Sequence, residues 1–337
     1  MVDVASGSLK LTEWTSCGGC AAKWGGSPLS ALVRDVAGAK LAEGLLVGLS
    51  PFDDAAVLRL APGLALVSTT DFFPPLVDDP DDFGAVAAAN ACSDVFAMGG
   101  RVVLALNIAA FPERLPTEAI AAIFAAAAAV VEEAGGVVAG GHTIRSDEPI
   151  FGLAVQGLVD PDHILTKGGA SAGDVLVLSK PIGTGIVLAG GTEVQKAAAT
   201  LGMRQLNRTA SESLVALGDA VHGATDVTGY GIAGHGWEVA ERSGSRVVID
   251  TGALPLYDGA LAAARAGTRT GGDARNRTYL EGHIDDGGID DALAALCFDP
   301  QTSGGLLAAV DPAAVSDLPG FTVIGEVADG AAGVLLR

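Results

Sequence analysis

Hydrophobic and polar positions along the first half of the chain predict an alternation of strands and helices. The runs at 55–60 and 64–69 are compatible with strands, and the turn residues Ala61-Pro62-Gly63 separate them. Small and apolar side chains recur at helical spacing over 82–98, and Gly99-Gly100 ends this helix. The same reasoning predicts a short helix near 29–37, a helix at 116–134, and strands at 102–110, 136–139 and 150–159.

The predicted elements of this half follow the order β-β-α-β-α-β-β. That order is typical of an α+β layer and not of a regular βαβ series. Asp71 is expected to end the second strand, and Gly140-Gly141-His142 is expected to form a tight turn. The first half is therefore predicted to be one α+β unit.

The pattern breaks near residues 160–172, at Asp160-Pro161-Asp162 and Lys167-Gly168-Gly169. We therefore predict a Gly- and Cys-rich tail at 1–30, an N-terminal domain at 31–162 and a C-terminal domain at 163–337. In the C-terminal domain the pattern predicts helices at 204–220 and 231–243, and strands at 174–179, 246–250, 304–310, 321–325 and 333–336.

The charge balance narrows the classes of function. The chain has 40 acidic and 20 basic residues among 337, for a net charge of −20. Non-specific nucleic-acid binding needs an excess of Lys and Arg, so neither nucleic acid nor an anionic membrane is an expected partner. The longest apolar run, 119–131, is followed by Glu132-Glu133 and predicts a buried helix. With no secretory signal at the start of the sequence, we expect a cytoplasmic protein with reduced cysteines.

Aspartates at the ends of predicted elements are the main candidates for chemistry. They are Asp53, Asp54, Asp71, Asp94 and Asp226, with small or hydroxyl neighbours. Mg²⁺ prefers a few carboxylates and phosphate oxygens, so these side chains suit a metal–nucleotide site. The alternative is that each aspartate caps a helix or a turn. The apolar surroundings of Asp54 and Asp94 together favour the metal site.

A nucleotide site would have to be built without a Walker loop, because the chain lacks Gly-x-x-x-x-Gly-Lys-Ser/Thr. Gly140-Gly141-His142-Thr143 and Gly183-Thr184-Gly185 are candidate phosphate-binding turns, since glycine lets backbone N–H groups approach an anion. Such glycine pairs are more often plain turns, so these two signals are weak.

The cysteines allow several interpretations. Cys17-x-x-Cys20 has the spacing of half a zinc site or of a redox pair, but no second pair of ligands accompanies it. Lys23 follows Cys20 by three residues, and a nearby lysine favours the reactive thiolate. An incidental exposed cysteine is the alternative. Cys92 and Cys297 are expected to lie in the core, and His235 is interpreted as a packing or capping residue.

Several long motifs, in order, resemble the selenophosphate synthetase (selenide, water dikinase) family over about residues 11–336. They are Ser68-Thr69-Thr70-Asp71-Phe72-Phe73, Ala91-Cys92-Ser93-Asp94-Val95-Phe96-Ala97-Met98-Gly99-Gly100, Gly140-Gly141-His142, Glu148-Pro149-Ile150-Phe151-Gly152-Leu153-Ala154-Val155, Lys180-Pro181-Ile182-Gly183, Thr225-Asp226-Val227-Thr228-Gly229-Tyr230-Gly231 and Asp299-Pro300-Gln301-Thr302-Ser303-Gly304-Gly305-Leu306. The resemblance implies a fold like aminoimidazole ribonucleotide synthetase, with two α+β domains and a homodimer whose N-terminal sheets join into a barrel. It implies a reaction that converts ATP, selenide and water into selenophosphate, AMP and phosphate.

The resemblance also implies roles for individual residues. Cys20 and Lys23 would be catalytic, and Asp54, Asp94 and Asp226 would bind Mg²⁺. The nucleotide contacts would be Lys23, Pro51, Phe52, Asp53, Asp71 and Asp94, with Gly140, Gly141 and His142 supplied by the partner subunit. The chain departs from the family at Cys17, an extra thiol, and at the apolar Pro51-Phe52. Whether selenide arrives free or on a selenium-delivery protein is left open.

Two other classes of function compete with this interpretation. One is another ATP-using enzyme of the same fold, such as aminoimidazole ribonucleotide synthetase, thiamine monophosphate kinase or the hydrogenase maturation type. The Cys-x-x-Lys segment and Thr69-Thr70-Asp71-Phe72-Phe73 disfavour it. The other is a non-enzymatic metal or redox protein that uses Cys17 and Cys20.

Overall fold

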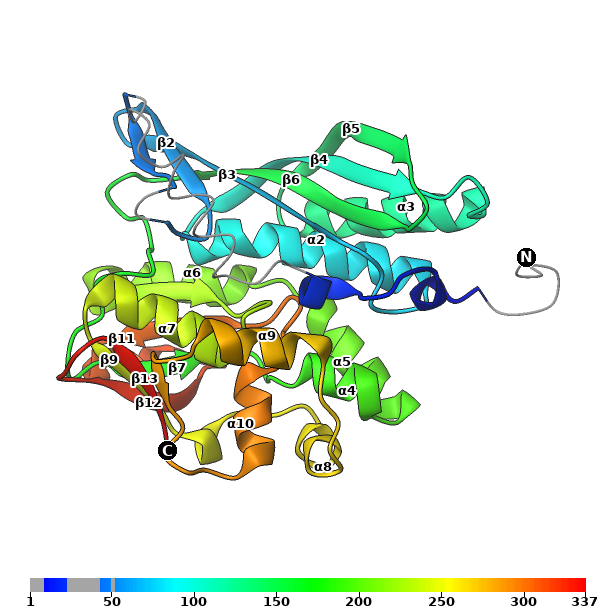
Figure 1. The fold of residues 1–337 in the computed structure, drawn as a ribbon. Helices are drawn as coiled ribbons and strands as arrows, with labels where there is room; N and C mark the ends of the chain where they lie inside the picture. The colour runs from blue at the N-terminus through cyan, green and yellow to red at the C-terminus, as the bar shows by residue number, and fades with distance from the viewer. Residues whose placement is uncertain (1–8, 23–42, 50–51) are drawn as a thin grey trace.

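The protein folds around two β-sheets, each with helices packed against it (Figure 1). The structure is a computed structural model that describes residues 9–22, 43–49 and 52–337. The helix predicted near 29–37 lies outside these residues. We call the part built on the first sheet the first half, and the part built on the second sheet the second half.

The first sheet has six strands in the order β1-β2-β3-β6-β4-β5. The strands are β1 (Leu45–Val47), β2 (Ala56–Ala61), β3 (Leu64–Phe73), β4 (Arg101–Phe111), β5 (Val137–Arg145) and β6 (Ile150–Val159). β6 pairs antiparallel with both β3 and β4, while β5 runs parallel to β4. β3 continues beyond its predicted end, so Asp71 lies inside the strand and not after it.

The predicted tight turn at Gly140-Gly141-His142 is wrong, because these residues continue β5. Gly141 pairs with Asn107 of β4, and a shift of register precedes this pair. A Cβ on Gly141 would lie 2.2 Å from the backbone oxygen of Asn107. Gly141 therefore serves a close approach of two strands, which a sequence pattern cannot distinguish from a turn.

Two helices cover one face of the first sheet, α2 (Pro80–Ala97) and α3 (Thr117–Glu133). Asp79 caps α2 through hydrogen bonds from the backbone N–H groups of Asp81 and Asp82. An aromatic cluster fills the space below the strands, where the Phe83 ring centroid lies 6.2 Å from those of Phe73 and Phe151. This cluster anchors α2 to the sheet.

The second sheet has seven strands in the order β10-β13-β9-β12-β7-β11-β8. The strands are β7 (Val175–Leu178), β8 (Val221–Asp226), β9 (Arg246–Ile249), β10 (Ile284–Asp285), β11 (Leu306–Val310), β12 (Thr322–Ala328) and β13 (Gly333–Leu336). The helices are α4 (Thr184–Gly190), α5 (Glu193–Arg204), α6 (Arg208–Leu217), α7 (Gly231–Ser243), α8 (Ala260–Arg265), α9 (Gly271–Tyr279) and α10 (Asp291–Phe298). Neither sheet closes into a barrel among the strands that the structure describes.

The helix predicted at 204–220 is wrong in extent. α5 ends at Arg204, α6 spans Arg208–Leu217, and a separate 3₁₀ turn leads into β8. The break is fixed by Asn207, whose side-chain amide donates to Ser93 Oγ and to the Gly304 carbonyl, both at 2.8 Å. These partners are distant in sequence, so the local pattern gave no sign of the break.

Helix α2 lies between the first sheet and the second half (Figure 1). Every residue from Phe83 to Ala97 is buried except Asp94. A helix that is buried on all sides belongs to the interior of a protein, which agrees with its small apolar residues. The single accessible position on this stretch is thus a carboxylate.

No helix in the described ranges is long and apolar enough to cross a membrane.

Candidate active site

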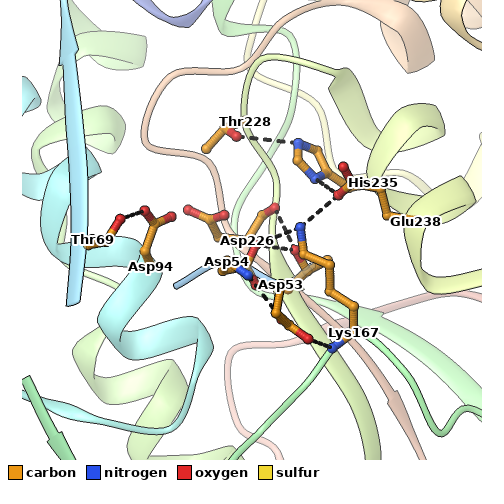
Figure 2. A network of polar contacts seen from close by, with 10 residues as sticks. Asp53, Asp54, Thr69, Asp94, Lys167, Asp226, Thr228, His235 and Glu238 are labelled. Atoms are coloured by element: carbon orange, nitrogen blue, oxygen red, sulfur yellow. Dashed lines mark hydrogen bonds and ion pairs between the residues drawn. The ribbon is translucent and has the colours of Figure 1, made fainter. Parts of the chain in front are cut away.

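Three aspartates from separate elements meet where α2 faces the second half. Asp54 lies just before β2, Asp94 lies on α2, and Asp226 ends β8. One carboxylate oxygen of each lies within 4.8 Å of those of the other two. Figure 2 shows the three side chains converging. The family resemblance implied these three residues as one metal site, and the fold brings them together.

The hydrogen bonds around the cluster leave some of its carboxylate oxygens without a protein donor among the described residues. Asp54 Oδ1 accepts from Lys167 Nζ at 2.8 Å and from Thr225 Oγ1 at 2.9 Å. Asp54 Oδ2 and Asp226 Oδ2 are buried and have no hydrogen-bond partner among the described residues. Asp94 Oδ2 accepts from Thr69 Oγ1 at 2.5 Å. Buried carboxylate oxygens need compensation, so this donor set fits a hard cation such as Mg²⁺.

The electrostatics of Asp54 support the same conclusion. Burial raises the pKa of Asp54 well above its usual range, and Asp226 and Asp53 add to this increase while the Lys167 ammonium opposes it. Several carboxylates gathered in a buried space repel one another. A divalent cation would relieve that repulsion.

A buried polar network that the sequence did not predict continues from Asp54 into α7 (Figure 2). Lys167 Nζ donates to Glu238 Oε2 at 2.7 Å, and His235 Nδ1 lies 3.0 Å from the same oxygen. His235 Nε2 in turn lies 3.3 Å from Thr228 Oγ1. His235 is therefore part of the polar network and more than the packing or capping residue expected from the sequence.

The charges in this network stabilise one another. Burial alone would raise the pKa of Glu238, but Lys167 and His235 outweigh it and lower the pKa to about 2. Burial opposes the charge on Lys167, yet Asp54 and Glu238 raise its pKa well above the ordinary value. Lys167 and Glu238 are thus a buried ion pair beside the aspartate cluster.

Two of the predicted nucleotide contacts lie at the edge of this network. Asp53 Oδ2 accepts from the Lys167 backbone N–H at 3.1 Å. Burial raises the pKa of Asp53, an effect that Lys167 opposes. The Phe52 ring centroid lies 5.8 Å from Lys167 Nζ, and Phe52 is 38% exposed. Phe52 and Asp53 therefore border the cluster.

Cys20, the predicted catalytic thiol, contacts the same helix, α2, that carries Asp94. It lies in a 3₁₀ turn, Gly19–Ala22, and is 1% exposed, so it is not an incidental exposed cysteine. Its thiol donates to Asn90 Oδ1 at 3.3 Å, and its backbone N–H donates to Thr302 Oγ1 at 3.0 Å. Asn90 Nδ2 donates to Asp71 Oδ2 at 2.6 Å.

Helical and strand periodicity explain how Cys20 and the aspartates come together. Asn90 and Asp94 are four residues apart and share one face of α2. Their partners on β3, Asp71 and Thr69, are two residues apart and share one face of the strand. One face of α2 thus holds the thiol on one turn and the metal-site carboxylate on the next. Sequence reasoning missed a role for Asn90, which showed only as a position at helical spacing.

Cys17 occupies a different environment from Cys20. It is half-buried and lines a cavity of about 360 Å³ together with Thr15, Thr184 and Thr302. Neither thiol is part of a disulfide, and neither belongs to a group of three or more His, Cys, Asp or Glu side chains that could hold a metal among the described residues. Cys92 and Cys297 are buried as predicted, and burial raises the pKa of each thiol to about 12.

Other predicted site residues are not gathered here. Lys23 and Pro51 lie outside the described residues. Gly140, Gly141 and His142 are exposed on β5, the edge strand that β4 and β6 separate from β3. The candidate phosphate turn before α4 is already occupied, because Gln301 Oε1 accepts from the backbone N–H groups of Gly183 and Thr184 at 2.9 and 3.0 Å.

Comparisons with known proteins agree on one family. Residues 52–159 match the family described as AIR synthase related protein, N-terminal domain, and residues 171–336 match its C-terminal domain. The chain is 43% identical over 307 residues to a selenide, water dikinase of Myxococcus xanthus. The aligned region covers 89% of this chain and 87% of that protein. It is 45% identical over 344 residues to a selenide, water dikinase of Burkholderia pseudomallei, which covers 96% of each chain.

Solved structures share the fold at low sequence identity. A thiamine monophosphate kinase from Aquifex aeolicus superposes with a TM-score of 0.68 at 19% identity, covering 92% of this chain and 96% of that one. The hydrogenase maturation protein HypE in complex with ATP superposes with a TM-score of 0.58 at 20% identity, covering 85% of each chain. These likenesses establish the two-part α+β architecture.

Proposed function

The chain belongs to the selenide, water dikinase family, and we propose that it converts ATP, selenide and water into selenophosphate, AMP and phosphate. The names of its relatives favour this function over the other enzymes of the fold and over a Cys-x-x-Cys metal or redox protein. The observation that carries the proposal is the convergence on one face of α2. There the Cys20 thiol bonds to Asn90 one turn from Asp94 of the aspartate cluster.

Asp54, Asp94 and Asp226 are the residues that we propose to hold Mg²⁺. When bound, Mg²⁺ neutralises negative charge on the phosphate groups during phosphoryl transfer. The protein's part is to fix the three carboxylates. Thr69 holds Asp94, while Thr225 and Lys167 hold Asp54, so two of the three carboxylates are oriented before a ligand arrives.

Cys20 is the proposed selenium-handling residue. Its thiol is buried against Asn90, and a dry environment keeps water from competing with selenium as the nucleophile. Thr302 fixes the backbone of Cys20 from the second half, while Asn90 fixes the thiol from the first half. We propose that Lys23 follows on the same segment and contacts the phosphates.

ATP is proposed to bind beside this cluster, as the shared fold with an ATP-bound protein supports. Phe52, Asp53, Asp71 and Asp94 border the site from the first half, and Pro51 completes the proposed set. Asp71 already orients Asn90 at 2.6 Å, so any nucleotide contact of Asp71 would be coupled to the position of the thiol.

We propose a homodimer in which the first sheets of two copies face each other and complete a barrel. The sheet face opposite α2 and α3 supports this arrangement. It presents Phe72, Leu106 and Ile144, which are 49%, 37% and 56% exposed. Large apolar side chains gathered on one open face indicate a protein contact. β5 would then offer Gly140, Gly141 and His142 to the partner's site.

Substitution of the two neighbouring cysteines tests the proposed role of the thiol. Cys20→Ser keeps the size of the side chain but removes the sulfur, so selenophosphate formation should fall roughly 100-fold or more, the scale of loss for a group acting on the reacting atoms. Cys17→Ser is the matched control and should stay within a few-fold of the wild-type rate. A Cys20→Ser enzyme with full selenide-dependent activity would remove Cys20 from the mechanism.

A further inference from the structure

Lys167 lies in the connection between β6 and β7, which joins the two halves. Its side chain is 5% exposed, and its ammonium lies 2.8 Å from Asp54 Oδ1 and 2.7 Å from Glu238 Oε2 (Figure 2). The proposed chemistry assigns nothing to Glu238, and burying two opposite charges is costly. A buried ion pair beside a metal site therefore calls for a function.

The contacts of Asp54 indicate what that function is. Lys167 Nζ and Thr225 Oγ1 both donate to Oδ1, at 2.8 and 2.9 Å. Two donors on one oxygen fix the rotation of the carboxylate. The other oxygen, Oδ2, is buried without a hydrogen-bond partner among the described residues, and Asp54 lies in the three-aspartate cluster. The donors thus leave one oxygen of Asp54 available for a cation.

Lys167 is itself held from behind. Glu238 Oε2 accepts from Lys167 and lies 3.0 Å from His235 Nδ1, and His235 Nε2 lies 3.3 Å from Thr228 Oγ1. These side chains belong to α7 and the turn before it, and each is at least 93% buried. A lysine anchored in this way cannot follow Asp54 if the carboxylate rotates. The chain of contacts therefore transmits the position of α7 to the metal site.

We propose that Lys167, anchored by Glu238, is a positioning residue that presents Asp54 Oδ2 to the divalent cation. The inference rests on one part of the proposed function, namely that a cation binds the three aspartates.

In a competing arrangement, the Lys167 ammonium would itself take the place of the cation. If the ammonium merely occupied the place of a cation, its removal would strengthen metal binding, whereas loss of a positioning residue weakens it.

The test is the affinity of the full-length protein for Mn²⁺, measured by electron paramagnetic resonance of the free ion with a non-hydrolysable ATP analogue present. Lys167→Met keeps most of the length of the side chain and removes the charge. We expect Mn²⁺ affinity to fall roughly 10- to 100-fold, as for other groups that orient metal ligands. Lys196→Met, at a lysine paired with the exposed Glu193 on α5, is the matched control and should not change it. Unchanged or tighter Mn²⁺ binding by a folded Lys167→Met protein overturns the proposal.

A second variant keeps the test decisive if Lys167→Met fails to fold. Glu238→Gln retains the shape of the anchor but weakens its hold on Lys167, so the Mn²⁺ affinity of the folded variant should fall by a few-fold. An unchanged affinity would refute the anchoring role. The outcome is separable from the proposed function. Weakened Mn²⁺ binding in a chain that makes no selenophosphate would refute only the reaction, and unaltered binding in an active enzyme would refute only the role of Lys167.

Discussion

A buried carboxyl group outside the metal site, that of Asp299, lies in the loop that holds Cys20. Asp299 is fully buried, and its Oδ2 accepts from the Ile186 backbone N–H and from Gln301 Nε2, both at 3.1 Å. Burial raises the pKa of Asp299 to about 7, although these hydrogen bonds oppose the increase. The loop 299–305 also contains Thr302, which accepts from the Cys20 backbone.

The raised pKa of Asp299 predicts a pH dependence of stability. The folded protein keeps the proton up to about pH 7, whereas the unfolded chain releases it near 3.8. The folded state therefore binds more protons in this interval, and its stability falls as the pH rises through it. Asp299→Asn lacks this effect. The free energy of unfolding of Asp299→Asn, minus that of the wild type, should therefore rise by about 2 kcal/mol from pH 5 to pH 8.

Urea unfolding at the two pH values measures this difference, because the other titrating groups cancel between variant and wild type. The exposed Asp329→Asn serves as the control and should track the wild-type protein at both pH values. A relative stability of Asp299→Asn that does not move with pH would show that Asp299 is ionised in the folded state throughout.

The site was predictable at some residues and not at others. Small and apolar neighbours made Asp54 and Asp94 stand out, and the resemblance to the family grouped them with Asp226 and favoured Cys20 over Cys17. Lys167 did not stand out, because the residues around it indicated only a boundary between domains. Its partner Asp54 is 113 residues away in the sequence. Pairings between segments so distant in sequence have no local pattern.

Helix α2 is the element on which the whole site depends. It carries Asn90 and Asp94 and packs against α3 on one side and the second half on the other. The approach to α3 is close at Gly84, where an added Cβ would lie 2.2 Å from the Ile123 backbone oxygen. The absence of a side chain at this position lets the two helices meet.

Replacement of Gly84 by alanine should therefore destabilise the protein, although alanine is usually preferred to glycine in a helix. Alanine normally stabilises an exposed helix by about 1 kcal/mol relative to glycine. Gly84→Ala should instead destabilise the protein by about 1–3 kcal/mol, because the backbone of α3 has to shift. Chemical denaturation measures the change. Gly271→Ala, in the exposed first turn of α9 with nothing within 4 Å of the new atom, should be neutral or slightly stabilising. Equal effects at both positions would contradict the close approach.

Elements were predictable where their own residues determine them. Strand β6 and helix α7 match the predicted 150–159 and 231–243, since their apolar patterns are regular and their ends carry turn residues. The helices α4, α5, α8, α9 and α10 were missed. Of these, α4, α8, α9 and α10 are short and are held by packing within the second half. β5 was cut short because Gly140 and Gly141 favoured a turn.

At the scale of the whole molecule, the open face of the first sheet determines the proposed assembly. Its apolar side chains have no cover within the described part of the chain, whereas α2 and α3 cover the other face. Burial of that face in a second copy would explain both the exposure of Ile144 and the position of the β5 glycines.

A charge placed on this face should break the proposed dimer. Ile144→Asp would bury an unpaired carboxylate in the contact, so dimer affinity should weaken at least about 10-fold. Sedimentation velocity over a range of concentrations measures it. Val194→Asp introduces the same charge at an 80% exposed position on α5 and should leave the assembly unchanged. A wild-type protein that is monomeric at all concentrations would refute the dimer itself.

We propose that one site of the protein couples ATP cleavage to the phosphorylation of selenium. Phosphorus NMR of the wild-type protein with ATP and Mg²⁺, in the presence and absence of selenide under anaerobic conditions, tests it most directly. We expect AMP, phosphate and a resonance with phosphorus–selenium coupling to appear together when selenide is present. ATP turnover that yields no phosphorus–selenium species would contradict it.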